Sequence, residues 1–124
     1  MHMSNRQDPF RYEFEMPIMG EFRLLRIDQR HVTHGYGSLE MLDMSYHGAR
    51  IVTKVDFQAN KHEIELSIII TINDEPMTVD GMIVYQISHG VEYVYGLRLH
   101  TDEAILRRIT DELKVYARRR LGRR

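Results

Sequence analysis

Apolar and polar residues alternate along most of the chain. This pattern predicts β-strands, because successive side chains of a strand point to opposite faces of a sheet. The first alternating run, FRYEFEMPI, covers residues 10–18, and the second, EFRLLRID, covers residues 21–28. Gly20 lies between them and is predicted to separate two strands, while Pro17 places the first strand at a sheet edge or ends it. Five further runs predict the remaining strands: 38–43, 49–57, 64–72, 78–87 and 91–100.

The pattern changes in the last quarter of the chain, where apolar residues recur at three- and four-residue spacing. This spacing is typical of an amphipathic helix, which we expect over residues 101–121. Thr101 is the predicted N-cap, and the arginines at 118–120 suit the negative end of the helix dipole. The apolar stripe of this helix must be covered, either by the barrel described next or by a second copy of the chain in a homodimer. The stripe consists of Ile105, Ile109, Leu113 and Tyr116.

The order of elements predicts a mainly β fold. Many short strands with tight turns, followed by one helix, favour an antiparallel barrel of six or seven strands, because a closed barrel leaves no exposed sheet edges. A chain of 124 residues has the length of one domain. We expect a flexible segment over residues 1–9 and the barrel with its helix over residues 10–124.

Composition and charge limit the classes of function. The net charge of −1, from 17 basic and 18 acidic residues, excludes a general polyanion binder, so any basic site must be local. The absence of cysteine excludes disulfides, thiolate metal sites and cysteine nucleophiles. It also fits a reducing compartment, and we expect a cytoplasmic location. No apolar run approaches the roughly 20 residues that a membrane-spanning helix needs.

Other chemical motifs are weak. No phosphate-binding loop or nucleophile elbow occurs, so we expect neither enzymatic activity nor a cofactor. His31 and His34 have the spacing of metal ligands, but no third ligand is evident, and we interpret them as part of a solvated loop. Tyr85, Tyr93 and Tyr95 suggest a stacking platform for single-stranded nucleic acid; at strand spacing, packing in the core and across strands is the favoured interpretation.

The turn DMSYHG, between two predicted strands, carries the most specific residues. Asp43 and Ser45 can hydrogen-bond nearby backbone N–H groups, and Gly48 can take a conformation that other residues avoid. These three residues therefore account for a turn by themselves. The question is whether they also bind a ligand.

Together with the order of strands, this turn resembles the D/N-x-S-x-x-G motif of PilZ domains, which are bacterial receptors for cyclic di-GMP. In that family the motif joins two strands of a six-stranded barrel, and a helix follows the barrel. The resemblance covers nearly the whole chain and includes DGMIVY at 80–85 and YGLRLH at 95–100. It implies a PilZ-type barrel whose bound nucleotide orders the N-terminal segment, so that a protein partner recognises the new surface.

The second motif of the family, R-x-x-x-R, is imperfect in this chain. Arg6 and Arg11 are separated by four residues instead of three, so Gln7 stands where the first arginine is expected; in the other register, Glu15 replaces the second arginine. A guanidinium can bind a phosphate through two N–H groups, pair with guanine O6 and N7, or stack on the base. The resemblance therefore implies a ligand site made of Arg6, Arg11, Asp43, Ser45 and Gly48.

Two alternatives stay open beside a cyclic di-GMP receptor. The first is a PilZ-like barrel that binds no nucleotide and acts only as a protein-interaction module. The second, less favoured, is a small barrel that binds single-stranded nucleic acid. For a receptor, the sequence implies cyclic di-GMP and an unidentified protein as partners, and it does not select an output pathway.

Overall fold

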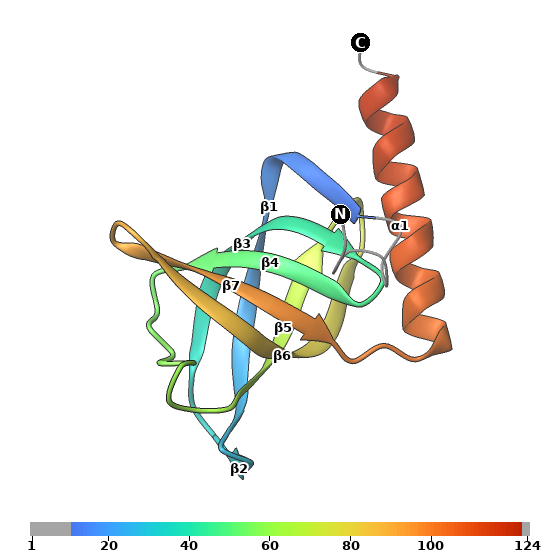
Figure 1. Cartoon of the computed structure of the whole chain (residues 1–124). Coiled ribbons are helices and arrows are strands. Elements are labelled where there is room, and N and C mark those ends of the chain that lie inside the picture. The colour runs from blue at the N-terminus through green and yellow to red at the C-terminus, as the bar shows by residue number, and fades with distance from the viewer. Residues whose placement is uncertain (1–10, 123–124) are drawn as a thin grey trace, which may run out of the picture.

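The computed structural model describes residues 11–122, and Figure 1 shows the arrangement of its elements. The predicted flexible segment at residues 1–9 lies outside this range. In chain order the elements are β1 (Arg11–Ile27), β2 (Arg30–His31), β3 (Tyr36–Ser45), β4 (Gly48–Thr53), β5 (Ile64–Thr71), β6 (Pro76–His89), β7 (Glu92–Leu99) and α1 (Glu103–Leu121).

Six of the strands close into an antiparallel barrel. The strand order is β2-β1-β3-β4-β7-β6-β5, and a further pairing between β1 and β5 joins the two ends of the sheet. The short strand β2 pairs only with the end of β1. The prediction of a mainly β fold with a six- or seven-stranded antiparallel barrel and a C-terminal helix is thus confirmed, as six barrel strands plus one extra strand.

Strand β1 corrects the predicted division at Gly20, because the two strands predicted there are one. The register between β1 and β3 shifts between Glu13 and Ile18, so Pro17 sits in a bulge and its missing N–H breaks no ladder hydrogen bond. A Cβ at residue 20 would lie 2.7 Å from the carbonyl oxygen of Ile69. The glycine therefore lets β1 pass close to β5, and the strand continues through it.

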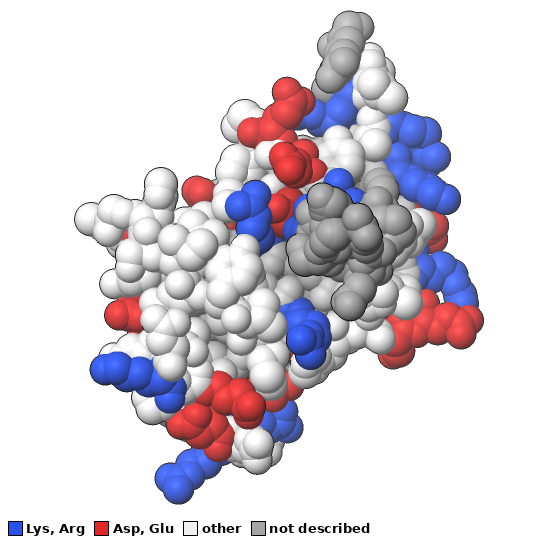
Figure 2. All heavy atoms as spheres, in the orientation of Figure 1, with Lys and Arg blue, Asp and Glu red and all other residues white. Residues whose placement is uncertain are grey.

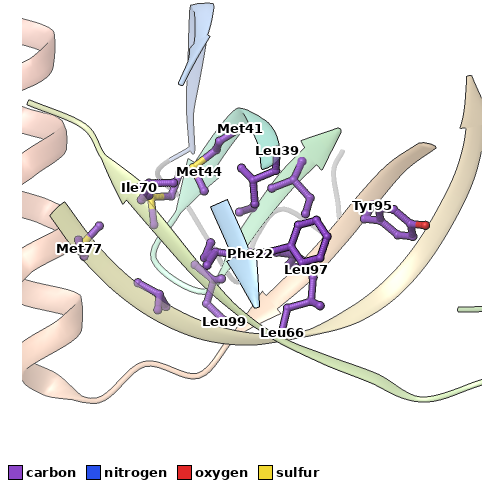
Figure 3. Close-up of a cluster of buried hydrophobic side chains, with 14 of the residues drawn as sticks. Phe22, Leu39, Met41, Met44, Leu66, Ile70, Met77, Tyr95, Leu97 and Leu99 are labelled. Atoms are coloured by element: carbon purple, nitrogen blue, oxygen red, sulfur yellow. The ribbon is translucent and has the colours of Figure 1, made fainter. Parts of the chain in front are cut away.

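The barrel interior is filled by one apolar cluster to which every long strand contributes. Leu66, Ile68 and Ile70 of β5 alternate with outward-facing residues and are at most 1% exposed, as the β-branched run predicted. Figure 3 shows Phe22, Leu39, Leu97 and other side chains of this cluster facing one another. This continuous core holds the outward-facing residues of neighbouring strands in fixed register.

Helix α1 covers one end of the barrel (Figure 1). Ile109 and Leu113 of its apolar stripe are fully buried against the barrel core, so the barrel itself supplies the cover that the stripe requires. The predicted N-cap was wrong by one residue, because Asp102 takes that position and its carboxylate accepts a hydrogen bond of 2.8 Å from the Ile105 N–H. Within residues 11–122, no helix is both long and apolar enough to cross a membrane.

Candidate functional site

The turn predicted from the sequence is a tight hairpin between β3 and β4. Met44 pairs with Ala49 on either side of it. The Ser45 hydroxyl accepts a hydrogen bond of 3.1 Å from the Gly48 N–H and lies 3.3 Å from the Gly48 carbonyl, to which it donates. The serine therefore closes the turn, and the local chemistry expected from the sequence accounts for its burial.

Asp43 has a different role, because its carboxylate holds two arginines. Its Oδ1 accepts a hydrogen bond of 2.5 Å from Arg11 Nη1, and its Oδ2 accepts one of 2.6 Å from Arg50 Nε. The Asp43 side chain is only 1% exposed, whereas those of Arg11 and Arg50 are 29% and 42% exposed. A buried carboxylate requires such pairing, since an unpaired charge in this position would be strongly destabilising.

The hydrogen bonds to Asp43 hold both guanidinium groups in place. The hydrogen bond from Arg50 to Asp43 raises the pKa of Arg50 above its ordinary value, and the charge of Asp43 adds to this effect. Each arginine has five N–H donors. Its bond to Asp43 uses one of them, and among residues 11–122 the other donors make no hydrogen bond, so they can serve a ligand on the barrel surface.

A surface hollow of about 480 Å³ is lined by Arg11, Asp43 and Arg50, among other residues. The hollow extends from β1 and β3 across β4 to β6 and β7, and its lining is Arg11, Glu13, Asp43, Ala49, Arg50, Val84, Tyr85, Gly96 and Leu97. Figure 2 shows one face of the molecule, with a wide uncharged area away from the helix and Lys and Arg side chains gathered along α1. With two arginines and two carboxylates in the lining, the hollow offers an anion a local pair of guanidinium groups rather than a general positive field.

Tyr85 supplies an aromatic ring at the rim of the hollow. The ring lies directly on Gly96, because a Cβ at residue 96 would be 2.0 Å from Tyr85 Cε2. The side chain stays 40% exposed. Tyr95 instead belongs to the core and Tyr93 packs beside it, so the favoured packing interpretation holds for these two tyrosines.

The structure brings together some of the residues implied by the family resemblance. Arg11 and Asp43 are in contact, and a Cβ on Gly48 would lie 3.5 Å from Arg11 Nη2. Ser45 is the last residue of β3 and closes the same turn through its hydrogen bonds with Gly48. Arg6 lies outside the described residues.

Sequence reasoning missed Arg50 and Glu13. Arg50 is two residues after Gly48, on the same face of β4, and its register partner is Asp43. A two-residue hairpin loop after Ser45 would have predicted this pair. Glu13 is the register partner of Asp43 on β1, and its carboxylate adds a second negative group to the lining.

The histidine pair of the sequence lies in and just after β2. His31 lies in β2 and His34 in the loop before β3, and both are exposed. Among residues 11–122, no group of three or more potential ligands from His, Asp and Glu lies close enough to hold a metal ion.

Comparison with known proteins supports the resemblance. A family model described as PilZ domain matches residues 5–113, which is most of the chain. No curated protein shows significant similarity to the chain.

Proposed function

Because the chain belongs to the PilZ domain family, whose members are binding domains and in general receptors for cyclic di-GMP, we propose that it binds this dinucleotide. The proposed site is the hollow lined by Arg11, Asp43 and Arg50. The observation that carries the proposal is the buried carboxylate of Asp43, which holds two guanidinium groups at the floor of this hollow.

The two arginines match the chemistry of the ligand. Cyclic di-GMP carries two phosphates and two guanines, and a guanidinium can bind either group through two parallel hydrogen bonds. Asp43 acts in this proposal as a positioning residue, since both of its oxygens already accept hydrogen bonds from Arg11 and Arg50. Arg50 thus joins Arg11 as a ligand contact, and Arg6 adds a third, less well-spaced arginine.

The turn residues and the tyrosine complete the proposed site. Ser45 fixes the hairpin that sets the register between β3 and β4, and with it the pairing of Asp43 with Arg50. Gly48 leaves the surface beside the Arg11 guanidinium open, because it has no side chain there. The exposed ring of Tyr85 offers a face on which a guanine can stack, a contact worth about 1–3 kcal/mol per base in proteins that bind single strands.

Isothermal titration with cyclic di-GMP tests this proposal. Arg11→Ala and Arg50→Ala are each expected to weaken binding by about tenfold to hundredfold, the range of a good arginine–guanine contact. Arg50→Lys keeps the charge but loses the planar pair of N–H donors that can bind a phosphate or a guanine bidentately, so it should also weaken binding. Gln7→Arg restores the family spacing with Arg11 and should tighten it.

The matched control is Arg107→Ala, which removes one positive charge from the exposed face of α1, where Arg107 pairs with Glu103. This variant should bind like the parent. Binding should also fall as salt rises, because the contacts to phosphate are screened. If neither the parent nor Gln7→Arg gives heat of binding at high micromolar nucleotide, the proposal fails and the protein-interaction module takes its place.

The downstream steps are part of the same proposal. The bound nucleotide brings Arg6 to the hollow, and a protein partner recognises the surface that results. The absence of cysteine supports action in the reducing cytoplasm of a bacterium, where the nucleotide signal is found.

A further inference from the structure

A second hollow lies toward the other end of β1, about ten residues along the strand from Arg11. Its volume is about 560 Å³, larger than that of the proposed nucleotide site. It opens on the outer face of the barrel, where β3, β1, β5 and β6 are paired side by side. Its residues come from neighbouring register positions of these four strands. Its lining is Glu21, Phe22, Arg23, Tyr36, Gly37, Ser38, Ser67, Ile69 and Thr78.

Ser67 is the unusual residue of this hollow, because its hydroxyl is buried and has no partner among residues 11–122. Four polar side chains are buried among residues 11–122. Asp43, Ser45 and Thr53 all make hydrogen bonds. Ser67 is 3% exposed, and no group in the described part of the chain hydrogen-bonds its hydroxyl. A buried polar group left unpaired is costly, so its presence on the wall of a hollow indicates a group that binds there.

Two charged side chains of β1 stand beside this hydroxyl. Arg23 is the register partner of both Ser67 on β5 and Tyr36 on β3, so its side chain lies between them on the outer face. Glu21 is two residues earlier on the same face, about 7 Å along the strand. Both side chains are exposed, and neither makes an ion pair with another described residue.

The remaining lining suits a flat ring. Tyr36 is 70% exposed and presents its ring at the edge of the hollow, next to Arg23. Ile69, half-buried beside Ser67, gives the floor an apolar part. A ligand that satisfies all of these groups needs an aromatic ring, acceptors for the arginine and donors for the carboxylate.

We propose that this hollow is a second site, independent of the first, which binds a guanine base. Guanine O6 and N7 accept hydrogen bonds from Arg23, and guanine N1–H and N2–H donate to the carboxylate of Glu21. The ring stacks on Tyr36, and the hydroxyl of Ser67 gains the partner that it lacks.

The test uses guanosine as the probe, because it carries the base without the phosphates that would favour the arginines of the first hollow. Amide resonances of the full ¹⁵N-labelled chain are followed by NMR as guanosine is added. We expect shifts at Gly37, Ser67 and Ile69. Adenosine should bind at least tenfold more weakly, since it offers Glu21 no N1–H donor and Arg23 no O6.

Ser67→Ala separates a ligand role from a structural one. The substitution removes an unpaired buried hydroxyl, so the melting temperature should stay the same or rise while guanosine binding weakens several-fold. The matched control is Ser88→Ala on the exposed end of β6, which should change neither quantity. A lower melting temperature for Ser67→Ala would show that the hydroxyl has a structural partner, and would overturn the proposal.

Two further variants distinguish this site from the first hollow. Arg23→Ala should weaken the binding reported by the shifts at Gly37, Ser67 and Ile69 about tenfold or more, while Arg50→Ala should leave the titration of these three residues unchanged. The opposite result would assign guanosine to the first hollow and refute the second site, without affecting the proposal for cyclic di-GMP. No shift up to the solubility limit of guanosine would refute the second site as well.

Discussion

At the scale of single residues, the proposed nucleotide site depends on how charges are balanced in one hollow. Arg11 and Arg50 face the carboxylates of Asp43 and Glu13. Asp43 is needed because it positions both arginines, whereas Glu13 makes no hydrogen bond or ion pair with the other described residues. The charge of Glu13 lowers the positive potential that a phosphate meets in the hollow.

This balance gives a prediction for Glu13→Gln. Removing its charge should tighten the binding of cyclic di-GMP by about threefold at low salt, the effect of one unit charge several ångströms away in a high dielectric. The gain should shrink as salt rises. Titration calorimetry measures both effects. Glu75→Gln, on the exposed loop between β5 and β6, is the control and should not alter affinity; tighter binding by that variant as well would show a long-range charge effect instead.

Tyr95 gives a second residue-scale prediction, which concerns stability and pH. Burial raises the pKa of Tyr95 from 10.0 to about 12. Its hydroxyl donates to the Val55 carbonyl and accepts from the Phe57 N–H. Because the folded-state pKa lies above the unfolded value, the stabilisation is fully present below pH 10 and is lost as pH rises toward 12.

Tyr95→Phe should therefore be less stable than the parent near pH 8, by about 1–3 kcal/mol, since it leaves the Phe57 N–H unpaired. The difference between the two proteins should become smaller from pH 10 upward. Urea unfolding at several pH values measures it. A difference that stays constant up to pH 11.5 would show that the Tyr95 hydroxyl ionises equally in both states.

What the sequence could predict at this scale depends on how local the interaction is. Asp43, Ser45 and Gly48 were identified because turn chemistry acts within six residues. Arg50 could also have been identified from the hairpin register. The burial of Ser67 could not be predicted, because its neighbours across the sheet are Arg23 of β1 and Asp80 of β6, and the pairing of β1 with β5 depends on barrel closure.

At the scale of elements, strand β1 and helix α1 also show that the sequence predicts local structure better than contacts between distant strands. Gly20 was predicted to end a strand because glycine weakens a strand interior. The approach of β5, which only the closed barrel supplies, makes this glycine necessary within a continuous strand. The helix was predicted more accurately, because an apolar stripe indicates a helix with one buried face. This pattern is the same whether the barrel or a second chain covers the face.

Leu113→Asp is the prediction for the helix. Leu113 is completely buried, and truncating such a leucine costs about 3–5 kcal/mol before the cost of burying a charge is added. The variant should melt far below the parent or fail to fold, as thermal denaturation would show. Leu121→Asp on the same helix is the control, because Leu121 is 64% exposed. Equal melting temperatures for the two variants would show that α1 does not contribute to the stability of the barrel.

At the scale of the whole molecule, helix α1 and the proposed nucleotide site share the first residues of β1. Arg11 lines the hollow. The rings of Tyr12 and Phe14, which follow Arg11 in β1, contact the ring of Tyr116 of α1 edge to face. Their centroids lie 5.6 and 5.3 Å from the centroid of Tyr116. Nearby, Arg120 pairs with Glu15. The bulge that follows in β1 interrupts its pairing with β3, so these helix contacts help to fix the position of Arg11.

The coupling between helix and site can be tested with Tyr116→Ala. Losing the edge-to-face contacts to Tyr12 and Phe14 should lower the melting temperature, because such contacts contribute about 0.5–1.5 kcal/mol each beyond burial. It should also weaken cyclic di-GMP binding about three- to tenfold, although Tyr116 does not line the hollow. Ile105→Ala is the matched control, since it truncates the opposite end of the same helix stripe. It should destabilise the fold without changing affinity. If both variants lose affinity in proportion to their stability, the effect is global and β1 does not transmit the position of α1 to the site.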